Sequence, residues 1–191
     1  MLAFLQSLVN ILLFRAGPQD MPSSWTLLKL TGLAALVTAA ATATGMLNLG
    51  FAPALLASAA KVGVYALIVF LLLKSGGKPE RWIQTMIALY GTLAITNLIS
   101  LPFLPDLQEV EEGKFVIVPG AGVMIVAVIE IWFLVILART LRDALEIRTG
   151  QAILLTILII IIETMVLSSL TGTLGIQSEA EIIGIGIPEP R

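Results

Sequence analysis

Three ionisable residues lie inside long apolar stretches of the chain: Lys61, Glu130 and Glu163. An ionisable side chain in the middle of a membrane span costs at least ~2.5–3.5 kcal/mol on insertion scales, so such residues generally face a partner or water. Lys61 and Glu163 lie about half-way along their stretches, and this shared depth is compatible with an ion pair. Glu130 is expected nearer the cytoplasmic end of its stretch, and Asn97 places an amide in a further one.

Two interpretations of these residues stay open. In the first, Lys61, Glu130, Glu163 and Asn97 form an intramembrane polar site that conducts protons, ions or a small solute. In the second, Lys61 and Glu163 form a structural ion pair that fixes the packing of the helices. The sequence favours the structural interpretation, because no series of carboxylates crosses the membrane.

The chain contains no His and no Cys. This composition excludes Ser-His triads, His-ligated haem, disulfides and Cys-ligated metals. Four acidic residues cluster at 106–112, but they lack the spacing of a calcium-binding loop and are predicted to be solvated. We therefore predict no catalytic residues, no cofactor, no metal site and no enzymatic activity.

The composition points to a membrane protein, because 58% of the 191 residues are hydrophobic and only 13% are charged. Soluble domains contain about 25% charged residues. The net charge of −2 provides no basic field for nucleic acid. About 20 apolar residues cross a bilayer, and five segments qualify: Trp25–Leu47, Phe51–Leu73, Trp82–Leu104, Ile117–Ala138 and Ala152–Leu174.

The distribution of basic residues predicts the orientation. If the spans alternate, seven Lys and Arg residues fall on one side, whereas only Lys114 and Arg191 fall on the other. The positive-inside rule then places the N-terminus in the cytoplasm and the C-terminus outside. We predict a multi-pass protein of a cell inner membrane.

The segments that flank the spans complete one predicted domain, residues 1–191. Residues 1–22 are predicted to form an interfacial amphipathic helix and a loop leading into the first span, although a short helix packed on the bundle is the alternative. Residues 23–175 form an all-α bundle of five transmembrane helices, and residues 176–191 form an extracytoplasmic tail. Small residues spaced four apart, such as Ala35 and Ala39, predict close helix packing within the bundle.

Two stretches resemble the Yip1 domain family of five-span membrane proteins. Residues 14–22 contain Gly17-Pro18 followed by Asp20 and Pro22, which is similar to the segment before the first span in short bacterial members. Residues 132–155 are similar to that family's join between spans four and five. The resemblance implies the five-span layout, and for bacterial members it implies no settled activity and no catalytic residues.

The predicted function is that of a non-enzymatic adaptor or scaffold for other membrane components. The alternative is a small ion, proton or solute permeation protein that uses Lys61, Glu130 and Glu163. In both cases the lipid bilayer is the first partner, with other membrane proteins or a second copy as further candidates.

Overall fold

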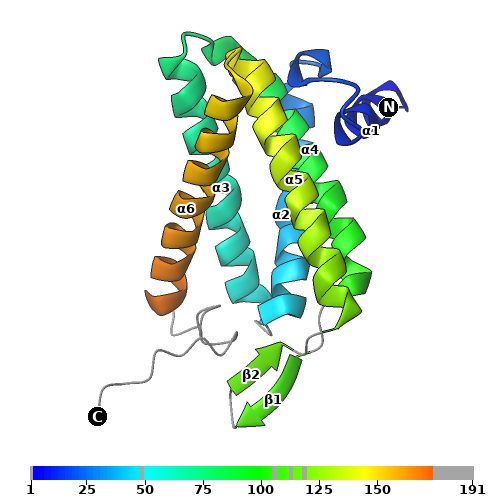
Figure 1. Ribbon diagram of the computed structural model, residues 1–191, viewed down its shortest axis with the longest axis vertical. Helices are drawn as coiled ribbons and strands as arrows, with labels where there is room; N and C mark the ends of the chain where they lie inside the picture. The colour runs from blue at the N-terminus through cyan, green and yellow to red at the C-terminus, as the bar shows by residue number, and fades with distance from the viewer. Residues whose placement is uncertain (1, 48–49, 105–106, 112–113, 118–119, 174–191) are drawn as a thin grey trace.

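Five long helices lie side by side, and a sixth, short helix lies across one end of them (Figure 1). The computed structural model describes residues 2–47, 50–104, 107–111, 114–117 and 120–173. The helices are α1 (Leu2–Leu12), α2 (Trp25–Leu47), α3 (Phe51–Ser75), α4 (Trp82–Ser100), α5 (Ala121–Leu145) and α6 (Thr149–Thr173). Short 3₁₀ turns at Pro18–Asp20 (η1), Pro79–Arg81 (η2) and Leu101–Phe103 (η3) flank α2 and α4.

The five long helices have the length and composition of membrane spans. The apolar segments are 22 to 25 residues long, and each contains a strongly apolar window. Because about 20 residues cross the hydrocarbon core, these helices indicate an integral membrane protein. The predicted all-α bundle of five spans with a short N-terminal helix is confirmed. The end where α3 leads into α4 and α5 into α6 is called the basic end below, and the opposite end is called the hairpin end.

Helix α4 forms the centre of the bundle, with 67% of its most apolar window buried. It packs most extensively against α2, where the small residues Ala35, Ala39 and Ala40 are buried. The hydroxyls of Thr92 and Thr96 donate to carbonyls one turn earlier in the same helix. Their polar atoms are therefore satisfied inside the core, and the small-residue stripes serve packing within the bundle, as predicted.

The boundaries of α5 differ from the predicted span, Ile117–Ala138. Ile117 belongs to a β-strand, and the helix runs from Ala121 to Leu145. A short apolar run rich in β-branched residues has the same hydropathy in a strand and in a helix. As a consequence, Glu130 lies nine residues after the start of α5 and fifteen before its end. Glu130 therefore lies nearer the hairpin end of α5, whereas the predicted span boundaries had placed it nearer the basic end.

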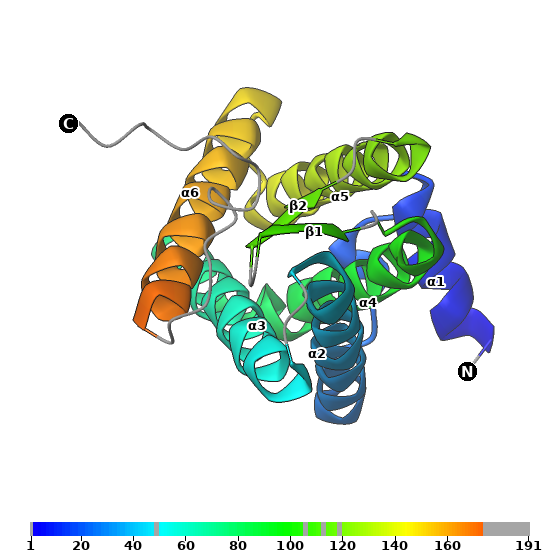
Figure 2. The same ribbon diagram turned by 90° about the horizontal axis from the view of Figure 1, so that it is seen from below.

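Helix α1 is both docked on the bundle and apolar on its outer side. Leu8, Ile11 and Leu12 are buried, whereas Leu5 and Val9 remain about half exposed. Figures 1 and 2 show α1 lying across α4 rather than along it. The structure thus shows the alternative, a short helix packed on the bundle, and leaves apolar residues exposed on the outer face of that helix.

A β-hairpin follows α4 in the region expected to be a solvated acidic loop. Strand β1 (Leu107–Glu111) pairs in antiparallel fashion with β2 (Lys114–Ile117), with a register shift between Glu109 and Glu111. The hairpin lies below the middle of the bundle (Figure 2). Asp106, Glu112 and the predicted tail, residues 176–191, lie outside the described residues.

Candidate functional site

The structure brings Lys61 and Glu163 together as an ion pair between α3 and α6. Lys61 Nζ lies 2.9 Å from Glu163 Oε1, and the two side chains are 29% and 10% exposed. The two residues share a depth because each lies ten positions from the hairpin end of its helix, one in each chain direction. This is the pairing that the common depth of the two residues had suggested.

Tyr65 belongs to the same polar cluster, although sequence reasoning did not include it. It lies one turn after Lys61 on α3, where residues four apart share a face, and it is 3% exposed. Tyr65 interacts with Glu163 and, more weakly, with the charge of Glu130. Its ring packs edge-on against Phe133 of α5, with centroids 6.5 Å apart. The cluster therefore involves α3, α5 and α6.

Asn97 lies apart from this cluster. Its Nδ2 donates to Thr38 Oγ1 over 3.4 Å, which links α4 to α2 inside the small-residue interface. Asn97 is buried at 7% exposure. Of the four predicted site residues, the structure thus joins Lys61 to Glu163, places Glu130 within electrostatic reach of Tyr65, and assigns Asn97 to helix packing.

A second polar site lies at the basic end, around Glu146. The Glu146 carboxylate forms ion pairs with Lys78 and Arg81. These two cations also donate to the last carbonyls of α5: Lys78 Nζ to Leu145 O at 3.1 Å and Arg81 Nη1 to Ala144 O at 3.2 Å. The hydrogen bond from Lys78, and then that from Arg81, holds the pKa of Glu146 below its usual value.

Glu146 does not pair with Arg142, which precedes it by four residues. Arg142 Nη2 instead lies 2.7 Å from Asp143 Oδ1. Helix α5 ends at Leu145, and Glu146 adopts a left-handed conformation with φ 57°. That turn directs Glu146 away from the helical position four residues after Arg142. Asp143 also lies 3.9 Å from Arg139 Nε, one turn earlier in α5.

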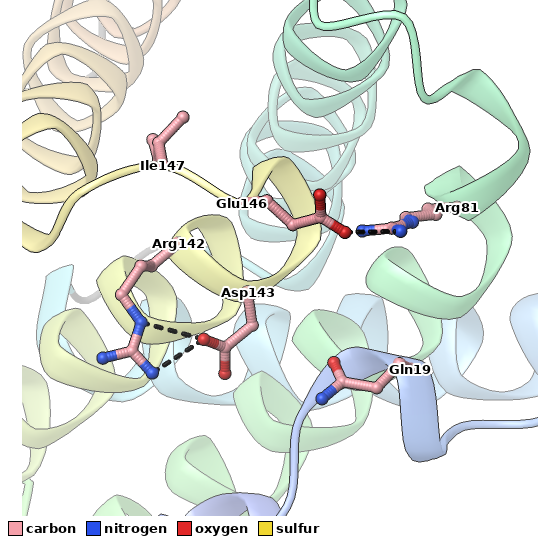
Figure 3. A pocket seen from close by; sticks show the side chains of 6 residues that line it. All are labelled: Gln19, Arg81, Arg142, Asp143, Glu146 and Ile147. Carbon is pink, nitrogen blue, oxygen red and sulfur yellow. Dashed lines mark hydrogen bonds and ion pairs between the residues drawn. The ribbon is translucent and has the colours of Figure 1, made fainter.

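These residues surround an open pocket of about 640 Å³ at the basic end. Figure 3 shows side chains from three separate segments around it, the turn after α1, the start of α4 and the end of α5. The lining residues are Gln19, Arg81, Arg142, Asp143, Glu146 and Ile147. Sequence reasoning did not bring these arginines together with the residue 14–22 segment, because that contact depends on tertiary packing.

The side chains that line this pocket can hold a polar group through hydrogen bonds and ion pairs. Two arginines supply planar arrays of N–H donors, and Asp143 and Glu146 supply acceptors. Within the described residues, no group of three or more acidic side chains is positioned to hold a metal ion.

The segment that resembles the Yip1 family folds into the turn next to this pocket. Pro18 starts η1, and the Gly17 N–H donates to Asp20 Oδ2 over 2.8 Å. Comparison with known protein families, with curated proteins and with solved structures finds no match to this chain. The chain is therefore described as a five-span integral membrane protein, and its Yip1 resemblance stays a prediction.

Proposed function

We propose that this protein is a non-enzymatic adaptor that binds other membrane components through its basic end. The observation that carries the proposal is the open pocket whose lining residues come from three separate segments. The ion pairs from Lys78 and Arg81 to Glu146 connect the α3–α4 turn to the end of α5. A pocket connected in this way presents a defined set of donors and acceptors to a partner.

The charge balance of the pocket indicates what kind of partner it suits. Arg81 and Arg142 are offset by Glu146 and Asp143, so the lining carries no large net charge. An isolated phosphate would be better matched by uncompensated arginines. Paired donors and acceptors instead suit a polar peptide segment, such as a loop of another membrane protein, that offers both N–H and carbonyl groups.

The basic residues at this end of the molecule support an orientation in the membrane. Most Lys and Arg residues outside the spans lie at the basic end or in the segment leading to it. By the positive-inside rule, this end faces the cytoplasm of a cell whose inner membrane holds the protein. The Gly17-Pro18 turn beside the pocket and the five-span layout support membership of the Yip1 domain family as part of this proposal.

Permeation through the Lys61 cluster is the second candidate function. The exposed Glu130 and the 29% exposed Lys61 side chain favour it. Against it, Leu73, Leu137 and Leu141 are fully buried between that cluster and the basic end. A conducting path would require these side chains to move, whereas the adaptor function requires no rearrangement.

Site-specific photocrosslinking in native membranes tests the proposal. A benzophenone side chain at Gln19 lies in the pocket lining, and the same probe at the exposed Trp25 provides a control outside the pocket. We expect a discrete protein adduct from position 19 that is lost when Arg142→Glu changes the pocket. Lipid adducts alone from both positions, or an adduct unaffected by Arg142→Glu, would contradict an adaptor role for this pocket.

A further inference from the structure

Arg139 lies at the point where the lipid-facing side of α5 changes from apolar to charged. The residues 11, 8 and 4 positions before it are Val128, Ile131 and Val135, and these spacings place all four on one side of the helix. The three apolar side chains are 63%, 60% and 49% exposed, and after Val135 the described residues of α5 include no further exposed large apolar side chain. Arg139 therefore lies near the lipid headgroups of the leaflet at the basic end.

The carboxyl end of α1 is attached to the same side of α5. Trp132 Nε1 donates to Leu12 O over 3.1 Å. Two residues later in the chain, the Phe14 ring faces the Arg139 guanidinium, with Cζ 5.6 Å from the ring centroid. A cation at this distance is attracted to the face of an aromatic ring. Leu13 is 48% exposed. We call Leu13, Phe14, Val135 and Arg139 the α1–α5 junction.

The positive charge of Arg139 is only weakly compensated by the protein. Its Nε is enclosed and has no hydrogen-bond acceptor among the described residues. The oxygen with which it forms an ion pair, Asp143 Oδ2, is 3.9 Å away, which is beyond hydrogen-bond distance. Asp143 is held instead by Arg142, whose Nε and Nη2 lie 2.8 and 2.7 Å from Oδ1.

The outer donors of Arg139 are accessible. The side chain is 36% exposed, and within the part of the chain that the structure describes its two Nη groups donate to no protein acceptor. A guanidinium carries five N–H donors in a planar arrangement. The Arg139 guanidinium, positioned on the Phe14 ring, is therefore available to an anionic group from outside the protein.

We propose that the α1–α5 junction binds an anionic phospholipid of the leaflet at the basic end, with the lipid phosphate on Arg139. Phosphate oxygens match the planar N–H donors of an arginine. An acyl chain of the same lipid lies along the exposed side of α5, over Val135 and Ile131. The exposed Arg15, next to Phe14 in the chain, adds a second positive charge. The proposal does not depend on the adaptor function, because the lining of the pocket at the basic end does not include Arg139.

Other ligands match the junction less completely. Free phosphate or a soluble acidic peptide would use the guanidinium of Arg139 and leave the apolar side of α5 to the bilayer. In a second copy of the chain, the carboxylates of Asp143 and Glu146 at the basic end are already held by arginine and lysine side chains. A phospholipid carries a phosphate and acyl chains in one molecule, at the depth where Arg139 and Val135 lie.

The test measures which lipid lies next to Trp132, which is seven residues before Arg139 on the same side of α5. Trp25→Phe together with Trp82→Phe leaves Trp132 as the only one of the three tryptophans. This full-length variant is reconstituted in phosphatidylcholine bilayers that contain a small fraction of phosphatidylglycerol or phosphatidylcholine with brominated acyl chains, which quench tryptophan on contact. We expect brominated phosphatidylglycerol to associate about fivefold more tightly, the effect of one basic residue at an anionic surface.

The matched variants change one arginine each. Arg139→Gln should remove the preference for phosphatidylglycerol. Arg148→Gln removes an exposed arginine from the same end of the molecule and should leave the preference intact. Arg139→Lys keeps the charge without the planar donors and should retain only part of the preference. Arg139→Lys also carries the test if Arg139→Gln does not fold.

Equal quenching by the two brominated lipids, or a preference that persists in Arg139→Gln, would overturn the proposal. An unchanged preference in Arg139→Lys would contradict a site built on the guanidinium. An equal loss in Arg148→Gln would show diffuse attraction to the basic end instead of a site at the junction. At fixed ionic strength, release of phosphatidylglycerol from Trp132 by inorganic phosphate or by a poly-glutamate peptide would assign Arg139 to that soluble ligand and overturn the lipid proposal.

Discussion

Removing one partner of the Lys61–Glu163 pair should destabilise the protein, and removing both should largely restore its stability. Breaking a buried pair from one side costs about 3–5 kcal/mol, because the remaining charge loses its compensation. Here the lower end of that range applies, since Lys61 is 29% exposed. We expect about 3 kcal/mol for Lys61→Met, which leaves Glu163 at 10% exposure.

Replacing Glu163 alone should lower the stability less than replacing Lys61 alone. In Glu163→Gln the remaining charge belongs to a long, flexible side chain that can reach toward polar surroundings, so we expect about 2 kcal/mol. Additive effects would make the double variant about 5 kcal/mol less stable than the wild type. We expect instead a loss of less than about 1 kcal/mol, because neither charge remains.

Unfolding in mixed micelles with a rising fraction of dodecyl sulfate measures these differences, with the three tryptophans as the signal. Thr164→Val is the matched control on α6, because Thr164 is exposed and its hydroxyl bonds only within the helix. It should change stability by less than about 0.5 kcal/mol. A double variant as unstable as the two single changes added together would refute the pairing as the origin of the effect.

Three further predictions concern the ends of the helices. Gly122→Ala should lower stability by about 1–3 kcal/mol in the same dodecyl sulfate titration, because a Cβ at this position would lie 2.7 Å from the Phe103 carbonyl oxygen. Gly63→Ala is the control and should stabilise α3 slightly, because a Cβ at Gly63 would have nothing within 4 Å. Because the pKa of Glu146 is lowered in the folded protein, its ion pairs stabilise the fold at pH values above the ordinary pKa of a glutamate. That stabilisation is lost as the pH falls through the lowered pKa. The melting temperature of the wild type should therefore fall more steeply than that of Glu146→Gln on acidification from pH 5 to pH 3, and parallel curves would contradict that contribution. Trp132→Phe removes the hydrogen bond to the last residue of α1 and should speed proteolysis at residues 13–24, measured by mass spectrometry of the fragments, with unchanged cleavage rates as the opposing result.

The spans and their packing could be predicted because they depend on local composition. Five apolar segments, the start of α2 after Ser24 and the close packing of Ala35 and Ala39 all follow from residue type and spacing. The Lys61–Glu163 pair could be predicted in part, because the depth of each residue within its span can be counted from the sequence. The contact between α3 and α6 could not be predicted from the sequence, because helix adjacency depends on the packing of the whole bundle.

The missed contacts depend on tertiary structure or on where an element ends. Tyr65 lies in a plain apolar segment, and its role appears only once α3, α5 and α6 are placed together. Glu146 pairs with Lys78 because a left-handed residue ends α5, while the four-residue rule assumes that the helix continues. The β-hairpin was missed because its first strand contains acidic residues that predicted a solvated loop, and because Ile117 at the end of its second strand was assigned to the following span.

Flux measurements on the purified protein test the central claim most directly. Proton and potassium flux into liposomes that contain the wild type is compared with flux into empty liposomes and into liposomes that contain Glu163→Gln. An adaptor predicts the same low flux in all three, with the reconstituted wild type folded as judged by its tryptophan fluorescence. Flux through the wild type that Glu163→Gln abolishes would contradict the adaptor function and identify the Lys61 cluster as a conduction site.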